Sequence, residues 1–168
     1  MRELTAPGKG SRLARYASRL ALFVATGAGI GYSPFCPGTV GTLGGVGLAW
    51  ELQGISVPGY LLGALVLLGV GIGAAGKAER LKGQKDPSCV VIDEVVGFWF
   101  AAFLVPAGIA SYALVFLLFR VLDIWKPVPR LELLPGGWGI MLDDVLAGIL
   151  ANLSFHSLRS LWYLWIAP

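Results

Sequence analysis

The sequence predicts an all-α fold, a polytopic integral membrane helical bundle with about four spans and a broken or re-entrant helix near its N-terminus. Of its 168 residues, 56% are hydrophobic and only 14% are charged, whereas soluble globular domains carry about 25% charged residues. Long stretches without Asp, Glu, Lys or Arg lie between Arg19 and Glu51, between Glu51 and Lys77, and between Glu94 and Arg120. A transmembrane helix needs about 20 predominantly apolar residues, so each stretch is long enough to cross a bilayer.

Basic residues are concentrated ahead of the first apolar run, at Arg2, Lys9, Arg12, Arg15 and Arg19. Lys and Arg accumulate in cytoplasmic segments and attract anionic lipid. We therefore interpret residues 1–19 as a basic cytoplasmic tail and residues 20–168 as a single membrane domain. A signal peptide over residues 1–31 is an alternative, although no A-x-A cleavage signal follows it.

The first apolar segment is interrupted early. Residues 20–31 are too short to cross a bilayer comfortably, and the segment Pro34–Gly38 that follows contains two prolines and a glycine. Because these residues forbid a continuous helix, we expect a half-helix, a re-entrant bend over residues 33–39 and a second helix over residues 39–53. Broken helices at membrane depth are tolerated where the loose backbone lines a site.

The rest of the chain predicts four further helices, at residues 58–76, 89–105, 109–125 and 140–160. Pro106 and Gly108 lie between the middle two helices and favour a hairpin there. A single kinked span over residues 95–119 is the alternative.

The charges predict the orientation of these helices. With the N-terminus inside, the chain crosses alternately, and the basic loop Lys77–Pro87 lies inside, as its charge requires. The C-terminus is then outside. Four unusual polar segments share the cytoplasmic face in this topology, namely residues 33–39, 93–94, 120–130 and 143–144. We therefore expect an active site on the cytoplasmic face.

Two adjacent carboxylates, Asp143 and Asp144, open an otherwise apolar helix. An ionised carboxylate at the centre of a membrane helix costs roughly 2.5–3.5 kcal/mol on insertion scales. A divalent cation would neutralise both charges, and carboxylates are ligands that Mg²⁺ prefers. The alternative is a pair of acids placed favourably by the helix dipole.

Half of the ten acidic residues fall in the same polar segments and are the candidate metal ligands, namely Asp93, Glu94, Asp123, Asp143 and Asp144. The last four are also the candidate catalytic residues. Small residues follow Glu94 at Gly97 and Ala101, and follow Asp144 at i+3, i+4 and i+7. Two such stripes can pack together and bring their acids to one ion. The alternative is ordinary membrane packing with the acids merely interfacial.

The candidate phosphate-binding residues are Thr39, Gly38, Arg120, Lys126 and Arg130. Pro37-Gly38-Thr39 begins a helix and offers free N–H groups and a hydroxyl, which suit a phosphate. Arg120, Asp123 and Lys126 lie three residues apart on one helical stripe. The two cations could hold phosphate oxygens, or the stripe could be an ordinary i,i+3 salt bridge.

Other nucleophilic chemistry has little support in the composition. Cys36 and Cys89 are too few and too isolated for a disulfide framework or a zinc site. We interpret His156, the single histidine, as structural or interfacial. A metal-activated water is therefore the favoured nucleophile, and an aspartyl-phosphate intermediate remains the alternative.

In combination, four motifs resemble those of the bacterial phosphatidylglycerophosphatase A family. They lie in order within residues 20–153, at Ser33–Thr42, Asp93–Gly97, Phe119–Pro129 and Gly136–Gly148. The resemblance implies a Mg²⁺-dependent phosphatase of the bacterial inner membrane. Its substrate would be phosphatidylglycerophosphate, a membrane phospholipid, and its products phosphatidylglycerol and phosphate, on the path to cardiolipin. The resemblance does not fix the metal ligands, and we expect no nucleic-acid partner.

Two other functions were weighed against this one. A CDP-alcohol phosphatidyltransferase also uses Asp-bound metal, but its motif requires spaced aspartates, whereas Asp143 and Asp144 are adjacent. A small cation transporter or channel subunit would need polar groups along a route between both faces. Here the polar groups are expected at one face.

Overall fold

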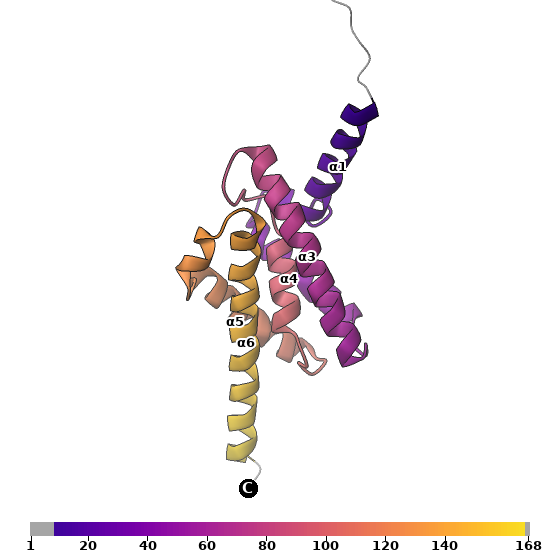
Figure 1. Cartoon of the computed structure of the whole chain (residues 1–168). Helices are drawn as coiled ribbons and strands as arrows, with labels where there is room; N and C mark the ends of the chain where they lie inside the picture. Colours follow the sequence, from indigo (N-terminus) through magenta and orange to yellow (C-terminus); the bar gives the residue numbers. More distant parts are fainter. Residues whose placement is uncertain (1–8, 167–168) are drawn as a thin grey trace, which may run out of the picture.

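The computed structural model describes residues 9–166, and every regular element in this range is helical. The six α-helices are α1 (Lys9–Ala25), α2 (Pro37–Glu51), α3 (Val57–Lys82), α4 (Ile92–Ala101), α5 (Ile109–Trp125) and α6 (Gly137–Ile166), and two short 3-10 helices, η1 (Ile30–Tyr32) and η2 (Pro129–Leu133), lie between them. The all-α prediction is confirmed. Figure 1 shows α3 and α6 as the two long helices of the bundle.

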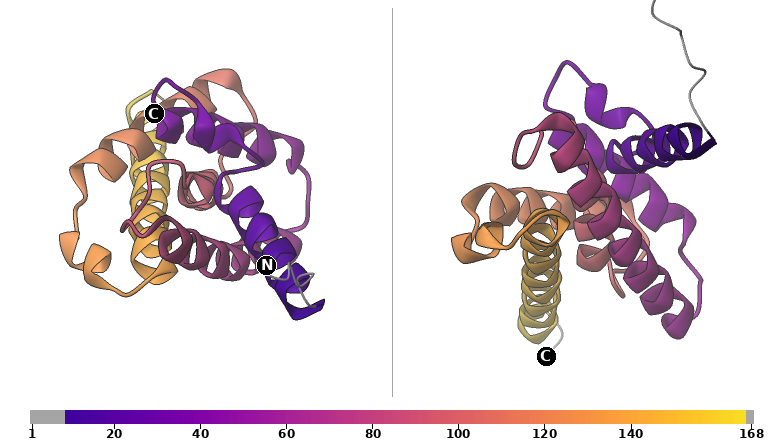
Figure 2. Two further views of the ribbon diagram at one scale, coloured as in Figure 1. Left: turned by 90° about the horizontal axis from the view of Figure 1, so that it is seen from above. Right: turned by 45° about the horizontal axis from the view of Figure 1, so that its top comes forward.

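The short helix α4 is the centre of the bundle. It packs against α2, α3 and α6, and the view from above in Figure 2 shows it enclosed by them. Val96 and Phe98 of α4 are fully buried. Because α2, α3, α5 and α6 all pack against α4, the acidic residues in its first turn are held at a fixed place in the fold.

Glycine lets α4 and α6 touch backbone to backbone. A Cβ atom added at Gly148 would lie 2.1 Å from the carbonyl oxygen of Gly97, and one added at Gly97 would lie 2.7 Å from the carbonyl oxygen of Asp144. No real Cβ atom fits at such distances. The expected packing of the small-residue stripes that follow Glu94 and Asp144 is therefore confirmed.

The C-terminal end of α4 lies inside the bundle, where its free carbonyl groups need donors. Asn152 of α6 supplies them, donating to the carbonyl oxygens of Ala101 at 2.9 Å and Phe103 at 2.7 Å. His156 Nε2 lies 3.3 Å from the same Phe103 oxygen. His156 thus contacts the backbone at this helix end, in agreement with the structural role expected for it.

The prediction of about four spans is not confirmed. Two helices of the described range are long and apolar enough to cross a membrane, α3 with 26 residues and α6 with 30. With ten residues, α4 is only about 15 Å long, half of a hydrocarbon layer of about 30 Å, so the helix is shorter than the expected 89–105 and a span there is not confirmed. The helices α2 and α5, with 15 and 17 residues, are also shorter than the usual span.

The helix boundaries correct two other expectations and confirm two more. The first helix begins at Lys9, not near residue 20, so the basic tail is partly helical. Helix α3 continues through the expected polar loop to Lys82, where Gly83, with a φ of 64°, ends it. The break before α2 and the hairpin between α4 and α5 are confirmed, and the alternative of a single kinked span is wrong.

The surface of α3 carries a continuous apolar stripe that the rest of the bundle leaves uncovered. Leu61, Leu62, Leu65, Val66 and Val70 are all more than two-fifths exposed. An exposed apolar surface of this kind marks a protein or membrane contact.

Candidate active site

Three carboxylates from two helices meet at one end of the bundle. Asp93 and Glu94 lie in the first turn of α4, and Asp144 lies on α6. One oxygen from each lies within 4.8 Å of the others. The Gly97–Asp144 backbone contact produces this meeting, because Gly97 is one turn beyond Asp93 and Glu94 on α4.

Each member of this carboxylate cluster keeps a buried oxygen without a hydrogen-bond partner in the described structure, namely Asp93 Oδ1, Glu94 Oε2 and Asp144 Oδ2. Asp93 and Asp144 are only 7% and 5% exposed. Burying a charge without compensation is costly, and a divalent cation removes the cost by accepting several carboxylate oxygens at once. The donor set of the carboxylate cluster therefore fits a hard divalent metal ion.

Burial also changes the titration of the two acids in the first turn of α4. Burial, followed by the neighbouring Glu94 charge, raises the pKa of Asp93 well above its ordinary value. Burial likewise raises the pKa of Glu94. Either protons or a cation must therefore neutralise the carboxylate cluster.

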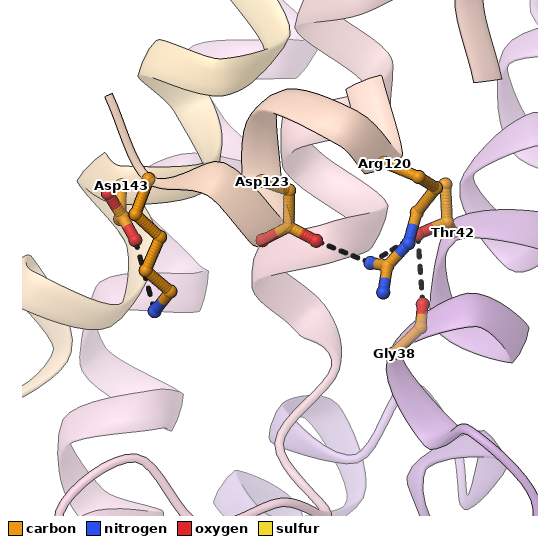
Figure 3. Close-up of polar contacts among 6 residues, drawn as sticks. Gly38, Thr42, Arg120, Asp123 and Asp143 are labelled. Atoms are coloured by element: carbon orange, nitrogen blue, oxygen red, sulfur yellow. Dashed lines mark hydrogen bonds and ion pairs between the residues drawn. The ribbon is translucent and has the colours of Figure 1, made fainter. Parts of the chain in front are cut away.

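Arg120 fixes a fourth carboxylate beside the cluster. Its guanidinium donates to Asp123 Oδ2 at 2.5 Å and to Thr42 Oγ1 at 3.3 Å. Thr42 in turn donates to the carbonyl oxygen of Gly38 at 2.9 Å. Figure 3 shows this chain of bonds from α5 to the first turns of α2. The bond from Arg120 to Asp123 is the i,i+3 salt bridge that the sequence left open as the ordinary interpretation.

Asp143 occupies a different position from its neighbour Asp144. Its Oδ2 lies 3.4 Å from the Nζ of Lys126, just beyond the end of α5, and its side chain is 7% exposed. Successive residues on a helix point about 100° apart, so adjacent aspartates cannot both enter one cluster in the same way. Asp143 instead ties α6 to the end of α5.

A hollow of about 480 Å³ joins these groups. Seven of the predicted site residues line it, namely Gly38, Asp93, Glu94, Asp123, Lys126, Asp143 and Asp144. The structure thus brings all five predicted acids to one hollow. Carboxylates that fit a divalent ion and the cationic Lys126 thus share the wall of this hollow.

Three predicted phosphate-binding residues do not line the hollow. Arg120 lies behind Asp123, bonded to it and to Thr42. Thr39 is half-buried in α2, and Arg130 is exposed in η2. Among these three, Arg120 is therefore placed to position Asp123 and the end of α2.

The hollow also has polar lining residues that the sequence reasoning did not select, Lys85, Asp86 and Ser88. They belong to the loop between α3 and α4. The sequence analysis used the charge of this loop only to orient the helices in the membrane. The loop immediately precedes Asp93 and Glu94, and this position would have placed it at the site.

Gly38 explains why α2 begins so close to the carboxylate cluster. A Cβ atom at Gly38 would lie 2.4 Å from Glu94 Oε1 and 3.4 Å from an Arg120 guanidinium nitrogen. A side chain at Gly38 would displace the Glu94 carboxylate from its observed position, and Pro37 and Gly38, in the first turn of α2, line one wall of the site.

The chain is similar in sequence to known proteins over most of its length. The family model described as Phosphatidylglycerophosphatase A matches residues 23–159. A protein of Escherichia coli named phosphatidylglycerophosphatase A is 35% identical over 134 residues, covering 76% of this chain and 77% of that protein. The protein of the same name from Haemophilus influenzae is 35% identical over 135 residues, covering 76% of this chain and 82% of its own length.

A third relative has a different name. A protein of Bacteroides thetaiotaomicron, named as a candidate phosphatidylinositol-3-phosphatase, is 43% identical over 143 residues, covering 79% of this chain and 89% of that protein. No solved structure matches the chain significantly.

Proposed function

Because the chain belongs to the phosphatidylglycerophosphatase A family, we propose that it hydrolyses phosphatidylglycerophosphate to phosphatidylglycerol and phosphate. The observation that carries the proposal is the carboxylate cluster of Asp93, Glu94 and Asp144, whose oxygens approach within 4.8 Å inside a hollow that opens at one end of the bundle. Family membership also favours a phosphatase over the alternative of a CDP-alcohol phosphatidyltransferase.

The carboxylate cluster would hold Mg²⁺, with Asp123 and Asp143 at the edge of the same hollow. When bound, such an ion supplies positive charge for the phosphate oxygens and lowers the pKa of a water molecule. The reaction adds a water oxygen to phosphorus, breaks the phosphorus–oxygen bond to glycerol and returns a proton to the alcohol that leaves.

The residues around the carboxylate cluster support recognition of a phosphate group. Lys126 and Lys85 both line the hollow and supply positive charge for a phosphate dianion. Arg120 holds Asp123 in one orientation through a charge-assisted hydrogen bond, which is stronger than a neutral one.

The substrate's two parts suit the two parts of the molecule. The acyl chains would remain in lipid beside the exposed apolar face of α3, and the phosphomonoester would enter the polar hollow. Lys77, Arg80 and Lys82 lie in the last turns of α3, toward the loop that lines the hollow. We therefore assign this end to the cytoplasmic side of the bacterial inner membrane.

A second candidate substrate has support from one relative. The Bacteroides thetaiotaomicron protein, at 43% identity, carries the name of an enzyme for phosphatidylinositol 3-phosphate. Both lipids present a phosphomonoester on a diacyl lipid, so the same hollow could receive either.

The experiment is phosphate release by the purified protein in mixed micelles, with the two lipids offered separately. We expect faster release from phosphatidylglycerophosphate, loss of release with EDTA and recovery with Mg²⁺. Faster release from the inositol lipid would reassign the substrate, and release that EDTA does not affect would remove the metal from the proposal.

A further inference from the structure

Helix α1 carries an apolar stripe that no other part of the described chain covers. Leu13, Tyr16, Leu20 and Phe23 are 58–70% exposed. They are spaced by three or four residues, so they lie on one face of the helix. Large apolar side chains gathered in this way need a partner surface.

Basic residues run along the edge of this α1 stripe. Arg12, Arg15 and Arg19 follow the same three- and four-residue spacing, and together with Tyr16 they line a shallow depression. Helix α1 contains no Asp or Glu. The partner surface must therefore combine apolar material with negative charge.

One end of α1 is fixed to the bundle on the opposite side. Ala25 is fully buried, and its carbonyl oxygen accepts a hydrogen bond from the N–H of Val91 at 2.9 Å. Leu22 packs into the core beside the alanines of α3. The α1 stripe is thus left on the free side of a helix that Figure 1 shows projecting from the bundle, at the end where α4 and α6 begin.

We propose that α1 is an interfacial anchor that binds an anionic lipid surface. Leu13, Tyr16, Leu20 and Phe23 enter the boundary between headgroups and acyl chains, as the apolar faces of amphipathic helices do. The arginines bind lipid phosphates, for which the planar guanidinium is well suited. Lipid is favoured over a protein partner because the α1 charges are all positive and lie close beside the apolar stripe. An anionic lipid surface supplies both the negative charge and the apolar chains that such a helix binds.

The anchor would hold the active-site end of the bundle against the leaflet that contains the substrate. It acts outside the carboxylate cluster, so its test needs no catalytic activity and can fail while the proposed phosphatase function stands.

The test is hydrogen–deuterium exchange of the full-length protein in vesicles of phosphatidylcholine alone or mixed with phosphatidylserine, which is neither the proposed substrate nor its product. We expect the α1 amides to exchange more slowly in the anionic vesicles, on the order of a hundredfold for three arginines at the surface. Exchange in α4 should be equal in both vesicles, which shows that the fold is unchanged.

Two variants with equal loss of charge make the test specific. Arg12→Gln/Arg15→Gln/Arg19→Gln should abolish the difference between the vesicles, whereas Lys77→Gln/Arg80→Gln/Lys82→Gln should keep it. Leu13→Ser/Leu20→Ser should raise α1 exchange in both vesicles. Equal α1 exchange of the unaltered protein in both vesicles would overturn the proposal, and so would protection that grows with protein density, since that result would identify a second copy as the partner.

Discussion

The backbone of Gly97 lies directly against Asp144, with room for no side-chain atom between them. A Cβ atom at Gly97 would lie 2.7 Å from the carbonyl oxygen and 2.9 Å from the Cβ of Asp144. This contact sets the distance between α4 and α6. It therefore also sets the distance between the acids of the first turn of α4 and Asp144, on which any shared ion depends.

Gly97→Ala should consequently impair both the fold and the site. Overpacking a tight contact costs about 1–3 kcal/mol of stability, and any separation of α4 from α6 moves Asp144 from Glu94. We expect a lower melting temperature. We also expect weaker Mg²⁺ binding, so that phosphate release requires a higher Mg²⁺ concentration. Gly73→Ala is the matched control, because a Cβ at Gly73 meets nothing within 4 Å. Equal behaviour of the two variants would show that the contact does not set the site.

Removing one charge from the carboxylate cluster should abolish catalysis without unfolding the protein. Asp144→Asn and Glu94→Gln keep the side-chain shape but lose a metal ligand, and we expect phosphate release to fall on the order of a hundredfold or more. Glu51→Gln, at an exposed position, provides the control for loss of one acidic charge. Full activity in either cluster variant would remove that residue from the site.

The hydroxyl of Thr42 should matter through the residues it holds. It accepts from Arg120 and donates to the Gly38 carbonyl, and each such bond contributes about 0.5–1.5 kcal/mol net. Thr42→Val should reduce phosphate release, because Arg120 then holds Asp123 and the α2 end less firmly. Thr42→Ser, which keeps the hydroxyl, should restore most of the rate. Equal rates for the two variants would assign Thr42 to packing alone.

The metal-free protein should become less stable as pH rises. Burial raises the pKa of Asp93 above its ordinary value of 3.8. At pH values between the ordinary and the folded-state pKa, the folded state therefore binds more protons than the unfolded state. Its contribution to stability is full below the ordinary pKa and is lost as pH rises toward the folded-state value. Thermal unfolding with EDTA across mildly acidic to neutral pH measures this slope.

Added Mg²⁺ should remove this dependence of stability on pH, because the ion neutralises the carboxylates in place of protons. Asp93→Asn should flatten it without metal and weaken stabilisation by Mg²⁺. A melting temperature that is independent of pH in the unaltered metal-free protein would contradict the interpretation of the buried oxygens.

The sequence was sufficient for most of the helices and for the acids. The expected helices match α2, α3, α5 and α6 to within six residues at each end, and the proline-rich break before α2 was recognised because proline and glycine act locally. The errors were of another kind. The amphipathic start of α1 was read as a tail, and α4 was expected to span the membrane although it ends inside the bundle. Its C-terminal carbonyl groups are satisfied by Asn152, which is 51 residues away from Ala101.

By itself, then, the sequence determined the helical class, the family likeness and the identity of the acidic side chains, since composition, periodicity and local breaks are properties of short segments. Only the tertiary structure decided which acids share a cluster. Asp144 joins Asp93 and Glu94, while its neighbour Asp143 pairs with Lys126. Helical periodicity turns adjacent side chains apart, and contact between glycines distant in the sequence selects the one that faces α4.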